Sequence, residues 1–66
     1  MKLKSRISYW KDKRGRSNKW IAGELKVSEE SVSRWINNKS YPSIHTLWDL
    51  AELLDCKVDD LYERIE

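Results

Sequence analysis

The sequence predicts an all-α protein, a compact bundle of five short helices in one domain covering residues 1–66. Apolar residues recur at the three- and four-residue spacing of amphipathic helices in successive segments. No two-residue alternation typical of strands persists, and there is no Asn-Gly or Asp-Gly hairpin turn. The length of 66 residues allows one small hydrophobic core and no second domain.

A stripe at helical spacing predicts the first helix near the N-terminus. Leu3, Ile7, Trp10 and the aliphatic stem of Arg14 fall on it, and Ser5 is available as its N-cap. Gly15 should end this helix, because glycine readily takes the left-handed conformation that closes a helix.

Two further helices joined by a tight turn are predicted between residues 18 and 37. Ser17 can cap the first of them, residues 18–25, and Ser28 can cap the second. Placing successive residues about 100° apart assigns the inward-facing side chains. They are Ile21, Ala22 and Leu25 on the first helix, then Val32 and Trp35 on the second, with Ile36 at its edge.

The remaining residues predict two more helices after a loop that Pro42 prevents from being helical. Asn38 can take the left-handed conformation that ends the preceding helix. Ser43 can cap the fourth helix, and Val58, Leu61 and Tyr62 indicate a short fifth one. The inward stripe of the fourth helix comprises Ile44, Leu47, Leu50, Ala51 and Leu54.

Charge is distributed unevenly along the chain. Residues 1–41 carry eleven Lys and Arg against four Asp and Glu, a net +7, whereas residues 42–66 carry two against seven, a net −5. A basic N-terminal part followed by an acidic C-terminal part is typical of a protein that binds a polyanion such as nucleic acid through one face. Small domains also acquire such asymmetry by chance, so charge alone leaves both explanations open.

Composition argues against several classes of protein. One cysteine, Cys56, and one histidine, His45, cannot supply a disulfide framework or a Cys-rich zinc site. There is no Gly-rich phosphate loop and no Ser-His-Asp or Cys-His set, so we expect neither an enzyme nor a metal or other cofactor. There is no signal peptide and no apolar run long enough to span a membrane, which predicts a cytoplasmic protein.

A run of residues from Ala22 to Lys39 carries a family resemblance. Its pattern is A-x-x-L-x-V-S-x-x-S-V-S-R-W-x-N-x-K, and the segment Pro42-Ser43-Ile44-x-x-Leu47 extends it. This pattern resembles the Cro/repressor-type helix-turn-helix family, the lambda-repressor-like domains. The resemblance implies a bacterial or phage transcriptional regulator that binds duplex DNA in the major groove through the helix 29–37. Among regulators it favours a repressor.

Several positions depart from the family pattern. Lys26 stands in the turn where the family usually has glycine, which implies either a different turn or a mildly strained one. Asn18 replaces a glutamine, and Ile36 replaces an acidic residue that pairs with the first helix in relatives. Glu29 and Glu30 occupy the first helical turn, where relatives carry Gln, Arg or Thr.

The resemblance and the helical geometry together predict the DNA contacts. A carboxylate can accept from cytosine N4, so Glu30 could contact a C·G pair, although acids also favour helix N-termini for dipole reasons alone. Arg34 could contact guanine O6 and N7 or merely a phosphate. The predicted base-contacting residues are Glu29, Glu30, Ser33, Arg34 and Asn37. The predicted phosphate-contacting residues are Asn18, Lys19, Ser28, Asn38, Lys39, Ser40 and Tyr41.

The family resemblance also implies a pseudo-palindromic operator bound by two copies of the protein. Side chains off the core stripes or near the C-terminus are candidates for a weak homodimer surface, namely Trp48, Leu53, Tyr62 and Ile65. An alternative from another class stays open. The chain could be a protein-binding helix-turn-helix module of the antitoxin or anti-repressor type, whose acidic helix start contacts a basic regulatory protein.

Overall fold

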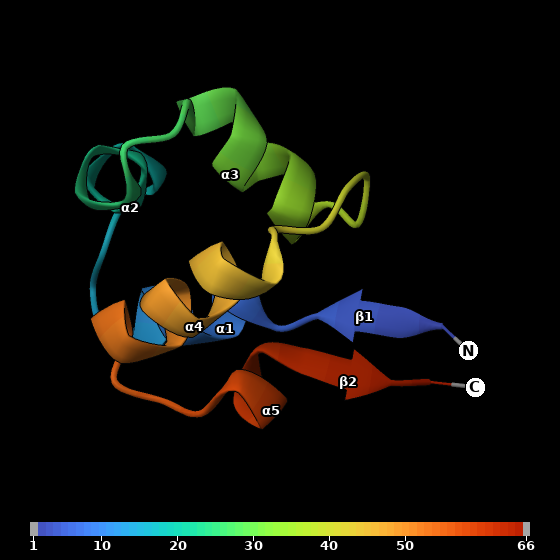
Figure 1. Ribbon diagram of the computed structural model, residues 1–66. Coiled ribbons are helices and arrows are strands. Elements are labelled where there is room, and N and C mark those ends of the chain that lie inside the picture. Colours follow the sequence, from blue (N-terminus) through green and yellow to red (C-terminus); the bar gives the residue numbers. More distant parts are fainter. Residues whose placement is uncertain (1, 66) are drawn as a thin grey trace.

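A computed structural model describes residues 2–65 and contains five helices and a two-stranded antiparallel sheet (Figure 1). α2 and α3 lie together at one end of the molecule, and α1, α4 and α5 lie beneath them. The five predicted helices are confirmed. Their bounds, with those of the strands, are β1 Leu3–Ser5, α1 Ile7–Lys13, α2 Asn18–Leu25, α3 Glu29–Ile36, α4 Ile44–Leu53, α5 Val58–Leu61 and β2 Tyr62–Arg64.

The sheet corrects the prediction of a purely α-helical protein. β1 and β2 pair with Leu3 opposite Arg64 and Ser5 opposite Tyr62. The Arg6 N–H donates to the Leu61 carbonyl at one end (2.8 Å), and the Ile65 N–H donates to the Lys2 carbonyl at the other (3.1 Å). We call this pair of strands the terminal ribbon. Leu3 and Tyr62 therefore belong to strands, and their assignment to the first and fifth helices was wrong.

α1 begins one residue later than its predicted cap implied. Arg6 occupies the N-cap position, whereas the Ser5 hydroxyl accepts a hydrogen bond from the Ile7 N–H at 3.2 Å. The end of the helix is confirmed, because Gly15 has φ +67°, in the left-handed region that favours glycine.

The serine caps of the next three helices are confirmed. In each case the hydroxyl accepts from the backbone N–H three residues on, which satisfies a donor that the helix itself leaves unpaired. The pairs are Ser17 with Trp20 (3.0 Å), Ser28 with Ser31 (3.1 Å) and Ser43 with Thr46 (3.2 Å).

The core lies where the helices meet and contains most of the residues that helical spacing predicted, with Leu25 and Leu47 half-buried against it and one clear exception. Ile44, assigned to the inward stripe of α4, is 78% exposed. It is the first residue of α4. Side chains on a helix lean toward its N-terminus, so a residue at this position projects past the end of the helix and away from the core. The buried residues are Ile7, Ile21, Ala22, Val32, Trp35, Leu50, Ala51, Leu54 and Leu61.

The turn between α2 and α3 is the strained form that Lys26 implied. Lys26 has φ 59° and ψ 44°, and the following N–H, from Val27, donates to the Ala22 carbonyl at 3.0 Å. This is the left-handed closure that glycine normally supplies. A lysine is held there by the packing on either side of the turn, at a cost of roughly 1–2 kcal/mol.

Replacing Lys26 with glycine should therefore stabilise the protein. We expect Lys26→Gly to raise the free energy of unfolding by about 0.5–1 kcal/mol, because relief of the left-handed strain outweighs the entropy that glycine adds to the unfolded chain. Urea denaturation followed by circular dichroism measures this change. Lys19→Gly, inside α2, is the matched control and should lower the stability by about 1 kcal/mol. Destabilisation by both variants would contradict the assignment of strain to Lys26.

Candidate nucleic-acid interface

α3 is fixed on one side by buried side chains and presents a polar face on the other. Val32 is fully buried and Trp35 is 6% exposed, and both pack into the core shared with α1, α2 and α4. These two residues, three apart, set the rotation of the helix about its axis. They therefore determine which side chains face outward.

The predicted base-contacting residues share this outward face. Glu29, Glu30, Arg34 and Asn37 are exposed, and Ser33 is half-buried. Asn37, the C-cap of the helix, donates from its amide Nδ2 to the Ser33 hydroxyl at 3.3 Å. The structure thus brings the set together on a single helical surface of a width that a major groove admits.

The two carboxylates at the start of α3 are exposed. Within residues 2–65 no side-chain hydrogen bond or ion pair involves the carboxylate of Glu29 or Glu30. Ser28, the cap before them, already uses its hydroxyl oxygen to accept from the Ser31 N–H and contacts the Ser31 hydroxyl at 3.0 Å. The acidic groups are consequently available to donors outside this molecule.

The first predicted phosphate-binding region is the start of α2. Lys19 is exposed, and Asn18 is half-buried with its Oδ1 atom lacking a hydrogen-bond partner within the described residues. The Arg16 guanidinium lies 4.3 Å from the centre of the Trp20 ring, close enough for a cation–π contact. Arg16 is exposed and lies directly before the Ser17 cap. Arg16 was not among the predicted phosphate-contacting residues, although its position next to a predicted helix N-terminus could have indicated that role.

The second predicted phosphate-binding region is the loop after α3. Asn38 has φ 60°, and the Lys39 N–H donates to the Arg34 carbonyl at 2.8 Å, which closes the helix. Lys39 is exposed, Tyr41 is 58% exposed and Ser40 is half-buried. The Asn38 side chain is engaged inside the molecule, since its Oδ1 accepts from the Ser5 N–H at 2.8 Å.

One cation of the basic half has a structural role. Arg14 donates from Nε to the Leu54 carbonyl and from Nη2 to the Asp55 carbonyl, both at 2.8 Å. These bonds join the end of α1 to the chain that follows α4. The net charge of residues 1–41 therefore overstates the positive charge that is free to meet a polyanion.

The four candidate dimer residues differ in how far they are exposed. Trp48 is 65% exposed and Ile65 is 53% exposed, whereas Leu53 and Tyr62 are half-buried against the core. Each of the four lines a different hollow of the surface. Burial of Tyr62 raises the pKa of its phenol to about 12. An exposed apolar pair does exist on α4, where Ile44 lies one turn before Trp48.

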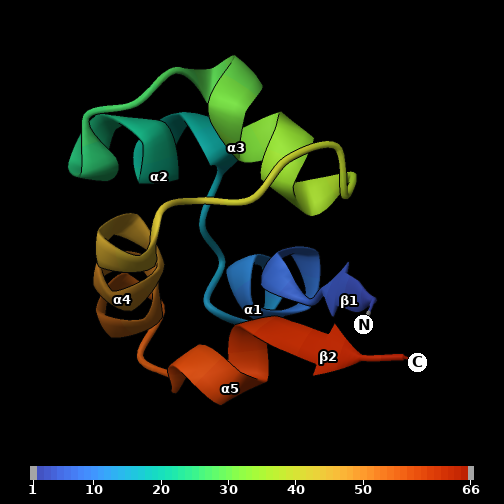
Figure 2. The ribbon, with the colours of Figure 1, turned by 45° about the vertical axis from the view of Figure 1, so that its right-hand side comes forward.

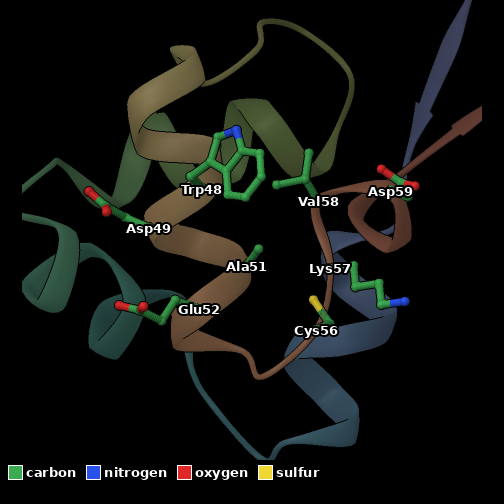
Figure 3. Close-up of a pocket in the computed structure, with 8 residues that line it drawn as sticks. All are labelled: Trp48, Asp49, Ala51, Glu52, Cys56, Lys57, Val58 and Asp59. Carbon is green, nitrogen blue, oxygen red and sulfur yellow. The ribbon is translucent and has the colours of Figure 1, made fainter.

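A partly apolar hollow lies beside Trp48, between α4 and the chain that leads into α5 (Figure 3). Trp48 and Val58 lie across it from each other, and Ala51 and Cys56 lie further along it. Acidic side chains lie around it, namely Asp49, Glu52 and Asp59. Burial raises the pKa of the Cys56 thiol, which disfavours the reactive thiolate.

Residues 2–65 contain neither a candidate metal site nor a candidate membrane-spanning helix. No group of three or more His, Cys, Asp or Glu side chains in this range could hold a metal ion. No helix in this range is both long enough and apolar enough to cross a membrane.

Both a family model and a solved structure are similar to this chain. A model of the helix-turn-helix family matches residues 7–61, which include all five helices. A crystal structure of a Bacteroides fragilis protein proposed to bind DNA superimposes with a TM-score of 0.88 at 35% sequence identity, over 94% of this chain and 100% of that chain. No curated protein matches the sequence.

Proposed function

Because this chain belongs to the Cro/repressor-type helix-turn-helix family, we propose that it is a sequence-specific regulator of transcription that inserts α3 into the major groove of duplex DNA. The observation that carries the proposal is the geometry of α3. One side is anchored by Val32 and Trp35, and the other presents exposed hydrogen-bonding groups of both signs. We further propose a bacterial or phage origin, action in the cytoplasm and repression by occlusion of an operator.

The proposed mechanism divides the contacts into two kinds. Contacts to the backbone position the domain, and they come from Asn18 and Lys19 at the start of α2 and from the loop 38–41 on the other side of α3. Contacts to base edges supply sequence preference, and Arg34 is the leading candidate because bidentate arginine–guanine contacts are the commonest specific ones. Glu30 would add a contact to cytosine N4, with Ser33 and Asn37 beside it.

Selection of bound sequences from a random duplex library tests this proposal directly. We expect enrichment of one motif and an affinity that falls steeply with salt, by about 0.9 logarithmic units per phosphate contact for each tenfold rise in salt. Absence of enrichment together with absence of salt-dependent binding to any duplex would overturn the proposal.

Lys39→Ala should weaken binding to every duplex by a similar factor. Lys39 is exposed in the loop after α3 and has no ion pair within the described residues. A lysine that contacts a phosphate supplies affinity without sequence information, so its loss should lower the salt slope by about one. Fluorescence anisotropy titrations at several salt concentrations measure the slope. An unchanged slope would remove Lys39 from the phosphate contacts.

We also propose that two copies bind a pseudo-palindromic operator, with half-sites about 34 Å apart. Of the predicted dimer residues, Trp48 has the greatest exposure, and Ile44 extends it along α4. Acidic residues around Trp48 would oppose self-association through this face, so the dimer should be weak away from DNA. Binding to a full operator that is no tighter than binding to one half-site would contradict the two-copy arrangement.

A second function is favoured by the acidic start of α3. Exposed Glu29 and Glu30 would repel phosphates unless each finds a donor on the DNA. The same groups suit a basic protein surface, as in an antitoxin or anti-repressor. Glu29→Gln/Glu30→Gln separates the two functions. Tighter, less selective DNA binding would assign the carboxylates to discrimination among DNA sequences, whereas a chain that binds no duplex with or without these changes would favour the protein partner.

A further inference from the structure

The terminal ribbon lies beside the loop that follows α3 and is joined to it by one hydrogen bond (Figure 2). The Ser5 N–H donates to Asn38 Oδ1 over 2.8 Å, between residues 33 positions apart in the chain. Asn38 is also the left-handed residue that closes α3. Its side chain thus connects the end of α3 to β1, a connection that a glycine at this position could not make.

The pairing of β1 with β2 explains why the Ser5 N–H can donate to the Asn38 side chain. Backbone hydrogen bonds to the C-terminal strand segment involve alternate residues: the Arg6 N–H donates to the Leu61 carbonyl, and the Lys2 carbonyl accepts from the Ile65 N–H. In an antiparallel pair the intervening residues point their N–H groups to the opposite edge. The Ser5 N–H therefore faces away from β2 and toward the loop, so β1 is held at both edges.

Two lysines lie next to the same loop, Lys4 in β1 and Lys2 directly before it. Lys2 and Lys4 are exposed and, being two residues apart in extended chain, point to the same side. Glu63 stands opposite Lys4 in the sheet, and no ion pair joins them within the described residues. A shallow hollow beside the loop is lined by Lys2, Leu3, Lys4, Asn38, Tyr41 and Ile65.

We infer that the terminal ribbon is a third phosphate-binding element of the DNA interface, in which Lys2 and Lys4 contact the backbone beyond the loop 38–41 and Asn38 positions them. The inference rests on the proposed function. Chain ends near a domain boundary usually fray, and a lysine on a frayed end contributes only diffuse attraction. A ribbon tied to the end of α3 instead presents its lysines at a fixed distance from the groove that α3 occupies.

Salt dependence measures whether the ribbon contacts phosphates. The duplex is the one selected from the random library, and the variants are Lys2→Gln, Lys4→Gln and the double change. Each single change should lower the salt slope by about one, and the double change by about two. Lys57→Gln is the matched control, because it removes the same charge from an exposed lysine before α5 and among acidic residues, and its slope should equal that of the unchanged protein.

Asn38→Gly tests the positioning role separately. Glycine accepts the left-handed backbone, so the fold and the closure of α3 should persist, with thermal unfolding as the check. Losing the bond to Ser5 should lower the salt slope as the lysine changes do, although asparagine carries no charge of its own. In the background of Lys2→Gln/Lys4→Gln, Asn38→Gly should have no further effect on the slope.

The outcomes separate the two proposals. Binding that persists with an unchanged slope in both lysine variants overturns the ribbon as a phosphate-binding element and leaves the DNA-binding function intact. Lysine effects without an effect of Asn38→Gly overturn the positioning role. Failure of the unchanged protein to bind any duplex overturns the proposed function and the ribbon contact with it.

Discussion

Trp35→Ala should unfold a large fraction of the protein at room temperature. Trp35 is 6% exposed and packs in the only cluster of fully buried residues within the described chain. Truncating a buried tryptophan to alanine costs about 3–5 kcal/mol, because it loses apolar contacts and leaves a cavity. A domain of this size has roughly 3–10 kcal/mol of stability in total. The melting temperature from circular dichroism should fall by more than about 12 °C.

Trp48→Ala is the matched control for this experiment. It removes the same side chain from a position that is 65% exposed on α4. Surface substitutions of this kind usually change stability by less than about 0.5 kcal/mol. The melting temperature should therefore stay within a few degrees of the starting value. A larger loss from Trp48→Ala than from Trp35→Ala would contradict the placement of the core on the inner side of α3.

The helices could be predicted because their determinants are local. Three serines begin helices by accepting a backbone hydrogen bond three residues on, and that spacing is visible in the sequence. Gly15 and Asn38 end helices through left-handed conformations that their residue types favour. The rotation of α3 followed from the three-residue spacing of Val32 and Trp35.

The terminal ribbon could not be predicted in the same way. Its strands have three residues each, too few to establish a two-residue alternation, and they pair across almost the whole chain. The exposure of Ile44 was also not predicted. Helical spacing places Ile44 on the apolar stripe of α4, but the core does not extend to this end of the helix. The bonds from Arg14 to the Leu54 and Asp55 carbonyls are equally non-local. For the ribbon and for Arg14, the deciding contact joins segments that lie far apart in the sequence, so no local pattern indicates it.

The sequence predicted which residues share the outward face of α3. It did not predict the hydrogen bonds that these residues and the following loop form within the molecule. Helical geometry placed Glu30, Ser33 and Arg34 on one surface without knowledge of the fold. It could not indicate that Asn38 bonds to β1, because the position of β1 was itself unknown. Ile36, where the family resemblance implied an acidic residue paired with the first helix, is half-buried and packs against the core.

Arg34→Ala should separate base recognition from phosphate binding. Arg34 is exposed in the last turn of α3, with its carbonyl engaged by the Lys39 N–H and its side chain on the outward face. If the guanidinium contacts guanine O6 and N7, the change should cost about 1–3 kcal/mol on the preferred duplex and relax selectivity at one base pair. Competition titrations against duplexes substituted at single positions measure both quantities.

Arg34→Lys sharpens the result, because lysine keeps the charge and loses the planar fork that bonds to two acceptors at once. A base contact predicts that Arg34→Lys loses most of the selectivity while retaining the salt slope. A phosphate contact predicts nearly full affinity for Arg34→Lys and an equal loss on all duplexes for Arg34→Ala. Glu30 lies one turn earlier on the same face, so a donor that satisfies its carboxylate must lie next to the base that Arg34 contacts. If both side chains contact bases, the selected motif should carry guanine next to a base that donates in the major groove, either cytosine through N4 or adenine through N6. A motif without such a neighbour would remove Glu30 from the base contacts.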